Sequence, residues 1–186
     1  MSVFFVHLKH AVAAVCLCFA VAGAVSAQEG RAAFLLEELR TAEADQIAGI
    51  LESLDALWMQ SGSPAIDLLL RRGEDALAEG AAEVALEHLT AAVDHAPEFA
   101  AAREARARAH YRLDQIGPAL EDIRAALALN PDHIGAIRGL ALILEELERF
   151  EDALALQHRL LDMMPAAEDV MAAIGRLETQ LRGRDA

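Results

Sequence analysis

The chain has 186 residues, of which 55% are hydrophobic and 25% are charged, and its 30 acidic side chains outnumber 16 basic ones to give a net charge of −14. This acidity argues strongly against nucleic acid, and also against an anionic membrane surface, as the partner, because neutralising phosphates requires a basic face. The length is sufficient to bury a substantial apolar core.

Residues 1–27 predict a secretory signal peptide. Lys9 precedes an apolar stretch from Ala11 to Val25, and the small residues that follow favour cleavage after Ala27. The alternative is an uncleaved membrane anchor, although this stretch is shorter than the roughly 20 residues that a spanning helix needs. We therefore expect a secreted, periplasmic protein with no membrane contact after cleavage.

The leader also contains both cysteines, Cys16 and Cys18, and the only lysine, Lys9. After cleavage the chain would have no thiol to form a disulfide, act as a nucleophile or bind a metal. Packing alone must then stabilise the exported domain.

Residues 28–63 predict an N-terminal helical hairpin. Its second helix has apolar residues at three- and four-residue spacing, which is typical of an amphipathic helix; these are Ile47, Ile50, Leu51, Leu54, Leu57 and Trp58. Ser61-Gly62-Ser63-Pro64 ends that helix, since proline cannot continue it. We expect Trp58, the only tryptophan, to seal the hairpin against the first repeat unit; the alternative is a contact point for a partner.

Residues 64–165 contain three columns of identical residues that recur every 34 positions. The columns are Pro97, Pro131 and Pro165; Ala85, Ala119 and Ala153; and Leu86, Leu120 and Leu154. A period of about 34 is typical of solenoids built from helix–turn–helix units. Three such units are expected, at about 66–99, 100–133 and 134–167.

Each unit is expected to consist of two antiparallel helices. The first helices are predicted at Ile66–Ala78, Ala100–Leu113 and Ile134–Leu147, and the second at Glu83–His95, Gly117–Leu129 and Glu151–Met163. An amphipathic helix within 168–182 would cover the last apolar face as a C-terminal cap. Because strand-like alternation is absent, the expected fold is all-α: an α-solenoid of antiparallel helix pairs between the N-terminal hairpin and the capping helix.

The third unit contains Gly139-Leu140-Ala141, Leu144, Phe150, Ala153-Leu154 and Pro165. At these residues, and at the matching columns of the other two units, the chain resembles the tetratricopeptide repeat (TPR) family, and the third unit matches best. The resemblance implies that Gly73, Ala107 and Ala141 face small residues of the second helices, because a larger side chain would force the helices apart.

The chain departs from the family pattern in two ways, one that affects the packing of the second unit and one that affects peptide binding. Arg103 and Arg106 occupy columns that the family fills with apolar residues, so we expect their stems to pack, their heads to reach water and their helix to be the loosest. Some members bind a terminal carboxylate through Lys and Asn side chains. The matching positions here are Leu70, Glu74, Ala105, Gly135 and Gly139, which do not support that mode.

The resemblance also implies that the first helices line a concave groove. The candidate peptide-binding residues are Arg71, Glu74, Glu104, Arg108, Tyr111, Arg112, Arg138 and Leu142. Guanidinium forks and a tyrosine ring suit recognition of an extended peptide. Taken singly, Glu104 and Arg108 lie four residues apart and also fit an ordinary pair on a helix surface.

No motif in the sequence favours catalysis. His88 and His95 lie seven residues apart, whereas metal-binding helices offer ligands four apart. His110, His133 and His158 are isolated, and no phosphate loop or nucleophile arrangement is present. We expect no enzymatic activity, no metal and no cofactor.

These observations favour a non-enzymatic scaffold or adaptor that binds a peptide segment or helix of an envelope protein, through the groove or the end caps. Self-association through Trp58 or the C-terminal helix, giving a homo-oligomer, is an alternative that could coexist with it. A metal-dependent enzyme using the histidines and carboxylates is the remaining hypothesis.

Overall fold

The computed structural model describes residues 28–184, so the leader predicted over 1–27 lies outside the described residues. A helical segment over 28–41 comes first. The helices that follow are α2 (Ala44–Trp58), α3 (Pro64–Ala78), α4 (Ala82–His95), α5 (Ala100–Arg112), α6 (Ile116–Leu129), α7 (Ile134–Glu146), α8 (Phe150–Met163) and α9 (Glu168–Arg184). Within 28–184 there is no strand, and none of the helices is both long and apolar enough to cross a membrane. The all-α prediction is confirmed.

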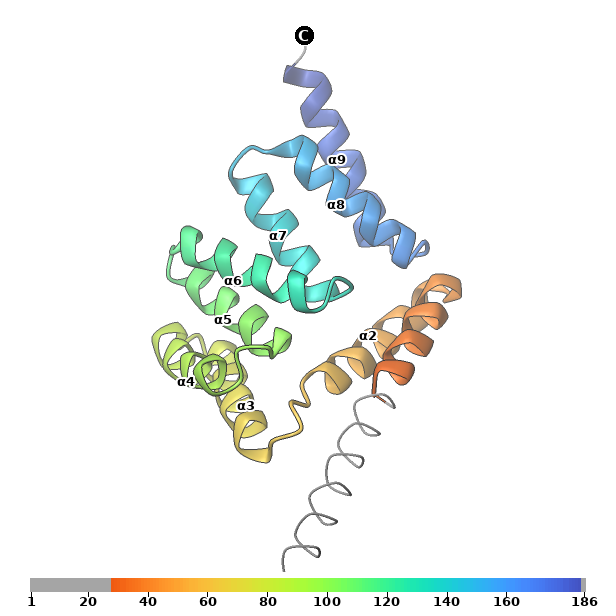
Figure 1. Cartoon of the computed structure of the whole chain (residues 1–186). Helices are drawn as coiled ribbons and strands as arrows, with labels where there is room; N and C mark the ends of the chain where they lie inside the picture. The colour runs from red at the N-terminus through yellow and green to blue at the C-terminus, as the bar shows by residue number, and fades with distance from the viewer. Residues whose placement is uncertain (1–27, 185–186) are drawn as a thin grey trace, which may run out of the picture.

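The helices from α3 to α9 stack in sequence order, as Figure 1 shows from yellow to blue. The pairs α3–α4, α5–α6 and α7–α8 form the three predicted units, and α9 packs on α8 as the predicted cap. Observed helix ends differ from the predicted ones by at most a few residues. The solenoid prediction is therefore confirmed.

The turn inside each unit repeats the same backbone geometry. The second residue after the first helix of each unit is left-handed: Gly80 has φ 78°, Asp114 59° and Glu148 57°. The next N–H then bonds to a carbonyl five residues back, from Ala81 to Ala76 at 2.8 Å, from Gln115 to His110 at 2.9 Å and from Arg149 to Leu144 at 2.8 Å. This closure of the helix end fixes the antiparallel return of the second helix.

One column of small residues lies where the two helices of a unit touch, and it consists of Gly73, Ala107 and Ala141. A Cβ on Gly73 would stand 2.4 Å from Cγ of Leu89, and Ala107 and Ala141 are buried at the corresponding places. The contact at Gly73 therefore requires a residue without a side chain, but the residue that faces it is Leu89 and not the small residue that was expected.

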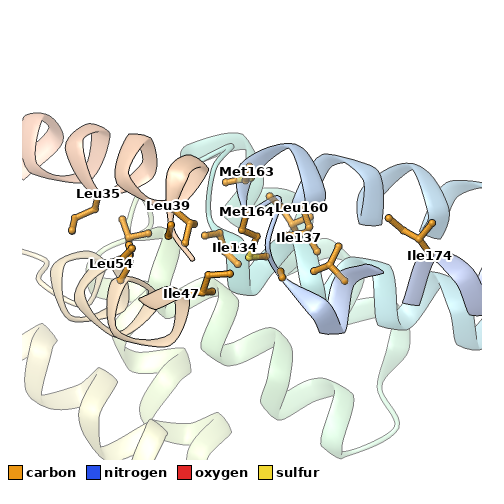
Figure 2. Packing of buried hydrophobic residues seen from close by; sticks show 14 residues of the cluster. Leu35, Leu39, Ile47, Leu54, Ile134, Ile137, Leu160, Met163, Met164 and Ile174 are labelled. Atoms are coloured by element: carbon orange, nitrogen blue, oxygen red, sulfur yellow. The ribbon is translucent and has the colours of Figure 1, made fainter. Parts of the chain in front are cut away.

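The N-terminal hairpin packs on the far end of the solenoid. One apolar cluster joins its residues to α7, α8 and α9, and Figure 2 shows the side chains meeting between these elements. The hairpin contributes Leu35, Leu39, Ile47, Ile50 and Leu54, and the far end contributes Ile134, Ile137, Leu160, Met163, Met164, Val170 and Ile174. The prediction that Trp58 seals the hairpin against the first unit is wrong, because Trp58 stacks on His133 at the start of the third unit.

Arg103 and Arg106, whose heads were expected to reach water, are only partly exposed and are ion-paired. Arg106 forms a two-bond ion pair with Asp122, with Nε–Oδ2 and Nη2–Oδ1 distances of 2.7 Å, and Arg103 lies 3.6 Å from the same carboxylate. Asp122 is only 3% exposed, and His110 also approaches it, at 3.9 Å. These ion pairs join α5 to α6, so the structure does not support the expectation that α5 is the least tightly packed helix.

Candidate functional site

A cavity of about 690 Å³ lies on the concave side of the solenoid. The first helices α3, α5 and α7 form its floor, and α2 forms a wall opposite them; Figure 1 shows α2 facing the repeats across this side. We call this cavity the groove. Its position follows from the docking of the hairpin on α7–α9, which carries α2 across the concave face.

Seven of the eight candidate residues line the groove. They are Glu74, Glu104, Arg108, Tyr111, Arg112, Arg138 and Leu142. Arg71 is exposed on α3 and does not belong to the lining. Sequence reasoning missed Asp55 of α2 and Met59, which follows α2, because no repeat column connects this part of the chain to the inner helices. Trp58 was named only as a possible contact point for a partner.

A charged centre lies at the middle of the groove. Arg108 is ion-paired with Glu74, and its Nε lies 3.0 Å from Oε1 of Glu104. Glu104 is only 9% exposed, and this burial raises its pKa to about 7 in spite of Arg108, with Glu74 and Asp55 adding to the rise. Partial desolvation also raises the pKa of Asp55, which keeps contact with water on the opposite wall. At neutral pH Glu104 is therefore partly protonated.

His133 lies beside this centre as a neutral, buried imidazole. It is the N-cap of α7, and its Nδ1 accepts the N–H of Ala136 at 3.3 Å. Burial, with a smaller effect of Arg108, lowers the pKa of His133 to about 4. The capping bond assigns the proton of the neutral ring to Nε2. The indole of Trp58 covers the ring, with centroids 5.0 Å apart and planes at 24°.

Gly135 lies where Glu104 and His133 approach each other, and an added Cβ would make ordinary contact with both. A Cβ there would stand 3.4 Å from Oε1 of Glu104 and 3.5 Å from the imidazole of His133. His133 could have been suspected from sequence, since it follows the Asn130-Pro131-Asp132 turn directly before a helix, where capping residues occur.

The remaining polar residues of the groove are largely held by their neighbours. Arg138 donates to Asp169 at 2.6 Å and contacts Sδ of Met164 at 3.9 Å, while its Nε is buried without a hydrogen-bond partner. Arg112 donates to the carbonyl of Leu77 at 3.4 Å. Leu142, in contrast, is 50% exposed and leaves an apolar spot on the floor.

The structure offers no candidate metal centre in its described part. Across residues 28–184, no three His, Cys, Asp or Glu side chains gather closely enough to hold a metal ion. His88 and His95 lie on α4, and neither lines the groove.

No family model matches the sequence. A TPR repeat-containing protein of Rhizobium etli is 28% identical over 144 residues, which cover 77% of this chain and 71% of that protein. The first TPR of Spaghetti (RPAP3), solved with an HSP90 peptide, aligns with a TM-score of 0.61 at 22% identity over 64% of this chain and 95% of that one. The chain therefore has the TPR fold and is similar in sequence to a TPR repeat-containing protein.

Two further structures agree with this TPR fold. The Sgt2 TPR domain from Aspergillus fumigatus has a TM-score of 0.60 at 21% identity over 66% of this chain and 83% of its own. MamA from AMB-1 extends the alignment to 82% of this chain and 84% of its own, with a TM-score of 0.55 at 18% identity. TPR folds generally mediate protein–protein interaction.

Proposed function

We propose that this protein is a non-enzymatic scaffold that binds an extended segment of another protein in the groove. The observation that carries the proposal is the groove itself: a concave cavity of about 690 Å³ with aromatic, apolar and charged walls. Ligand sites commonly have such a volume and such a mixture of apolar walls with a few convergent polar groups.

The groove combines two kinds of contact that an extended segment needs. Trp58, Tyr111 and Leu142 offer flat or apolar surface, which supplies affinity when water is excluded. The charged centre around Arg108 offers directional partners for polar groups. Since α2 adds a wall opposite the inner helices, a bound segment would be contacted from both sides.

The same proposal includes export, with the leader cleaved after Ala27 and a partner in the cell envelope. It is supported by the charged start, apolar core and small-residue exit of residues 1–27. Cell fractionation followed by mass measurement of the purified protein tests it. A periplasmic product that begins at Gln28 is expected, and an intact N-terminus in the membrane fraction would favour the anchor instead.

Two exposed leucines allow a matched test of the groove. Leu142 is 50% exposed on the groove floor, and Leu68 is 43% exposed on α3 outside the groove lining. Leu142→Glu should abolish capture of partner proteins from an envelope extract, whereas Leu68→Glu should leave capture unchanged. If both variants captured the wild-type set of proteins, the groove would not be the binding surface.

A further inference from the structure

We propose that the groove selects a segment carrying a basic side chain, lysine or arginine, which enters between Asp55, Glu74 and Glu104. This inference rests on the proposed function, because it names the chemistry that a segment bound in the groove must present.

The charge balance at the charged centre of the groove favours a cationic ligand. Carboxylates from α2, α3 and α5 (Asp55, Glu74 and Glu104) line one cavity, and in the described part of the chain a single guanidinium, that of Arg108, is ion-paired among them. Arg112 and Arg138 also line the groove, so the lining as a whole is balanced, but the charges that act on Glu104 are those of Arg108, Glu74 and Asp55. Three acids around one base leave a local negative excess in a partly dry site, where charge interactions are stronger than in water. A second cation would correct this imbalance.

An anionic ligand fits the charged centre less well than a cationic one. Arg108 is already engaged by Glu74 and Glu104, and Arg138 is engaged by Asp169, whereas Arg112 donates to the carbonyl of Leu77. A carboxylate bound at Arg108 or Arg138 would have to displace these acids. An incoming ammonium or guanidinium displaces none of them.

The repeat columns show that packing alone does not require an acid at position 104. One unit earlier, the same column holds Leu70, which is completely buried. Glu104 is nearly as buried, at 9% exposed, although a buried carboxylate costs free energy unless it is well paired. An acid in a column that leucine can fill is consistent with a role in binding.

The neighbouring surfaces suit the rest of a basic side chain. Trp58 and Tyr111 line the same cavity as the three acids. The aliphatic stem of lysine or arginine packs on such rings while its charged head reaches a polar partner. A cation near an aromatic face is further stabilised by the ring quadrupole.

Proton release on binding gives an independent signature. The groups that face Glu104 are Asp55 from α2, Glu74 from α3, Arg108 from α5 and the neutral imidazole of His133 at the start of α7. Burial raises the pKa of Glu104 to about 7, and a bound cation would lower it. Binding near pH 7 should therefore release a proton, measurable by calorimetry in two buffers of different ionisation enthalpy.

The primary test is selection of peptides from a random display library on the purified protein. Wild-type protein should select peptides with lysine or arginine enriched at one fixed position. Glu104→Gln, and Glu74→Gln as a second variant, should lose this enrichment. The control Glu87→Gln, at an exposed acid of α4 outside the groove, should keep it. Circular dichroism would verify that each variant is folded.

The outcomes separate the two proposals. Selected peptides without a basic preference, or with an acidic one, would overturn this inference and leave the proposed function standing. Failure of the wild-type protein to select any peptide would overturn both.

A substitution in the ligand then measures the contact itself. Replacing the basic residue of a selected peptide with norleucine should weaken binding to the wild type about tenfold, as expected for loss of a charge-assisted bond. The same replacement should have little effect on binding to Glu104→Gln. Equal losses for the two proteins would place the cation elsewhere and contradict the inference.

Discussion

The indole of Trp58, the last residue of α2, stacks on the imidazole of His133, the residue that caps α7. This contact joins an element that precedes the repeats to the third repeat unit. It also closes one side of the groove beside Glu104. The stability of the hairpin and the shape of the groove therefore depend on the same pair of rings.

Substitution of Trp58 tests how much this stack contributes. Trp58→Ala should lower the free energy of unfolding by about 2 kcal/mol, because a stacked aromatic pair and part of an apolar surface are lost. Trp58→Phe should retain most of the stability. Urea unfolding measures both values, and hydrogen exchange should show faster exchange over 28–58 in Trp58→Ala. An unchanged midpoint for Trp58→Ala would mean that the stack is not stabilising.

Glu104 and His133 should give the stability opposite dependences on pH. Burial raises the pKa of Glu104 from its usual 4.5 to about 7, so its contribution is present below pH 4.5 and is lost as the pH rises to 7. Burial lowers the pKa of His133 from its usual 6.5 to about 4, so its contribution is present above pH 6.5 and is lost as the pH falls to 4. In the wild type the two effects largely compensate.

Single substitutions should unmask each effect. Relative to wild type, Glu104→Gln should gain up to roughly 3 kcal/mol of stability between pH 4.5 and pH 7.5. His133→Asn, which can still cap α7, should show the opposite trend, with its relative stability highest near pH 4. Urea unfolding across pH 4 to 8 measures both curves. Curves parallel to that of the wild type would show that neither group titrates as described.

Asp122 should be essential to the packing of α5 on α6. Asp122→Asn leaves Arg106 and Arg103 without their buried counter-charge, which should cost about 3 kcal/mol. The neighbouring exposed acid provides the control, since Glu121→Gln should change the stability by less than about 0.5 kcal/mol. Equal stability of the two variants would show that the ion pairs are not stabilising.

Two glycines should respond to alanine in opposite directions. At Gly73 the added Cβ would collide with Leu89, at 2.4 Å from its Cγ, so Gly73→Ala should cost about 2 kcal/mol. At Gly49, an exposed position inside α2, nothing lies within 4 Å of the added Cβ, and Gly49→Ala should stabilise by about 0.5–1 kcal/mol. Thermal unfolding compares the two, and stabilisation by both would contradict the close helix contact at Gly73.

The repeat columns predicted the architecture well because they record contacts between neighbours in sequence. Gly73, Ala107 and Ala141 mark the helix contact within each unit, and the recurring prolines mark its end. The same columns brought seven of the eight candidate residues onto one face, since equivalent positions of stacked units line a common surface.

Contacts outside the columns were not predictable in the same way. The apolar stripe of α2, with Ile47, Ile50 and Leu54, requires a partner surface but does not specify which one, so the docking on α7–α9 was missed. Asp122 did leave a signal. Its column holds Leu156 in the third unit, and an acid there could have been paired with Arg103 and Arg106 in the adjacent helix.

The fluorescence emission of Trp58 tests most directly whether partners bind in the groove between α2 and the inner helices. Trp58 is the only tryptophan in the sequence, and it lies in the groove wall. A tryptophan-free peptide selected on the wild-type protein would be titrated while this emission is recorded. We predict a change that saturates at one peptide per chain, with the same Kd as calorimetry, and that is absent in Leu142→Glu. Calorimetric binding that leaves the Trp58 emission unchanged, or that persists undiminished in Leu142→Glu, would contradict the account.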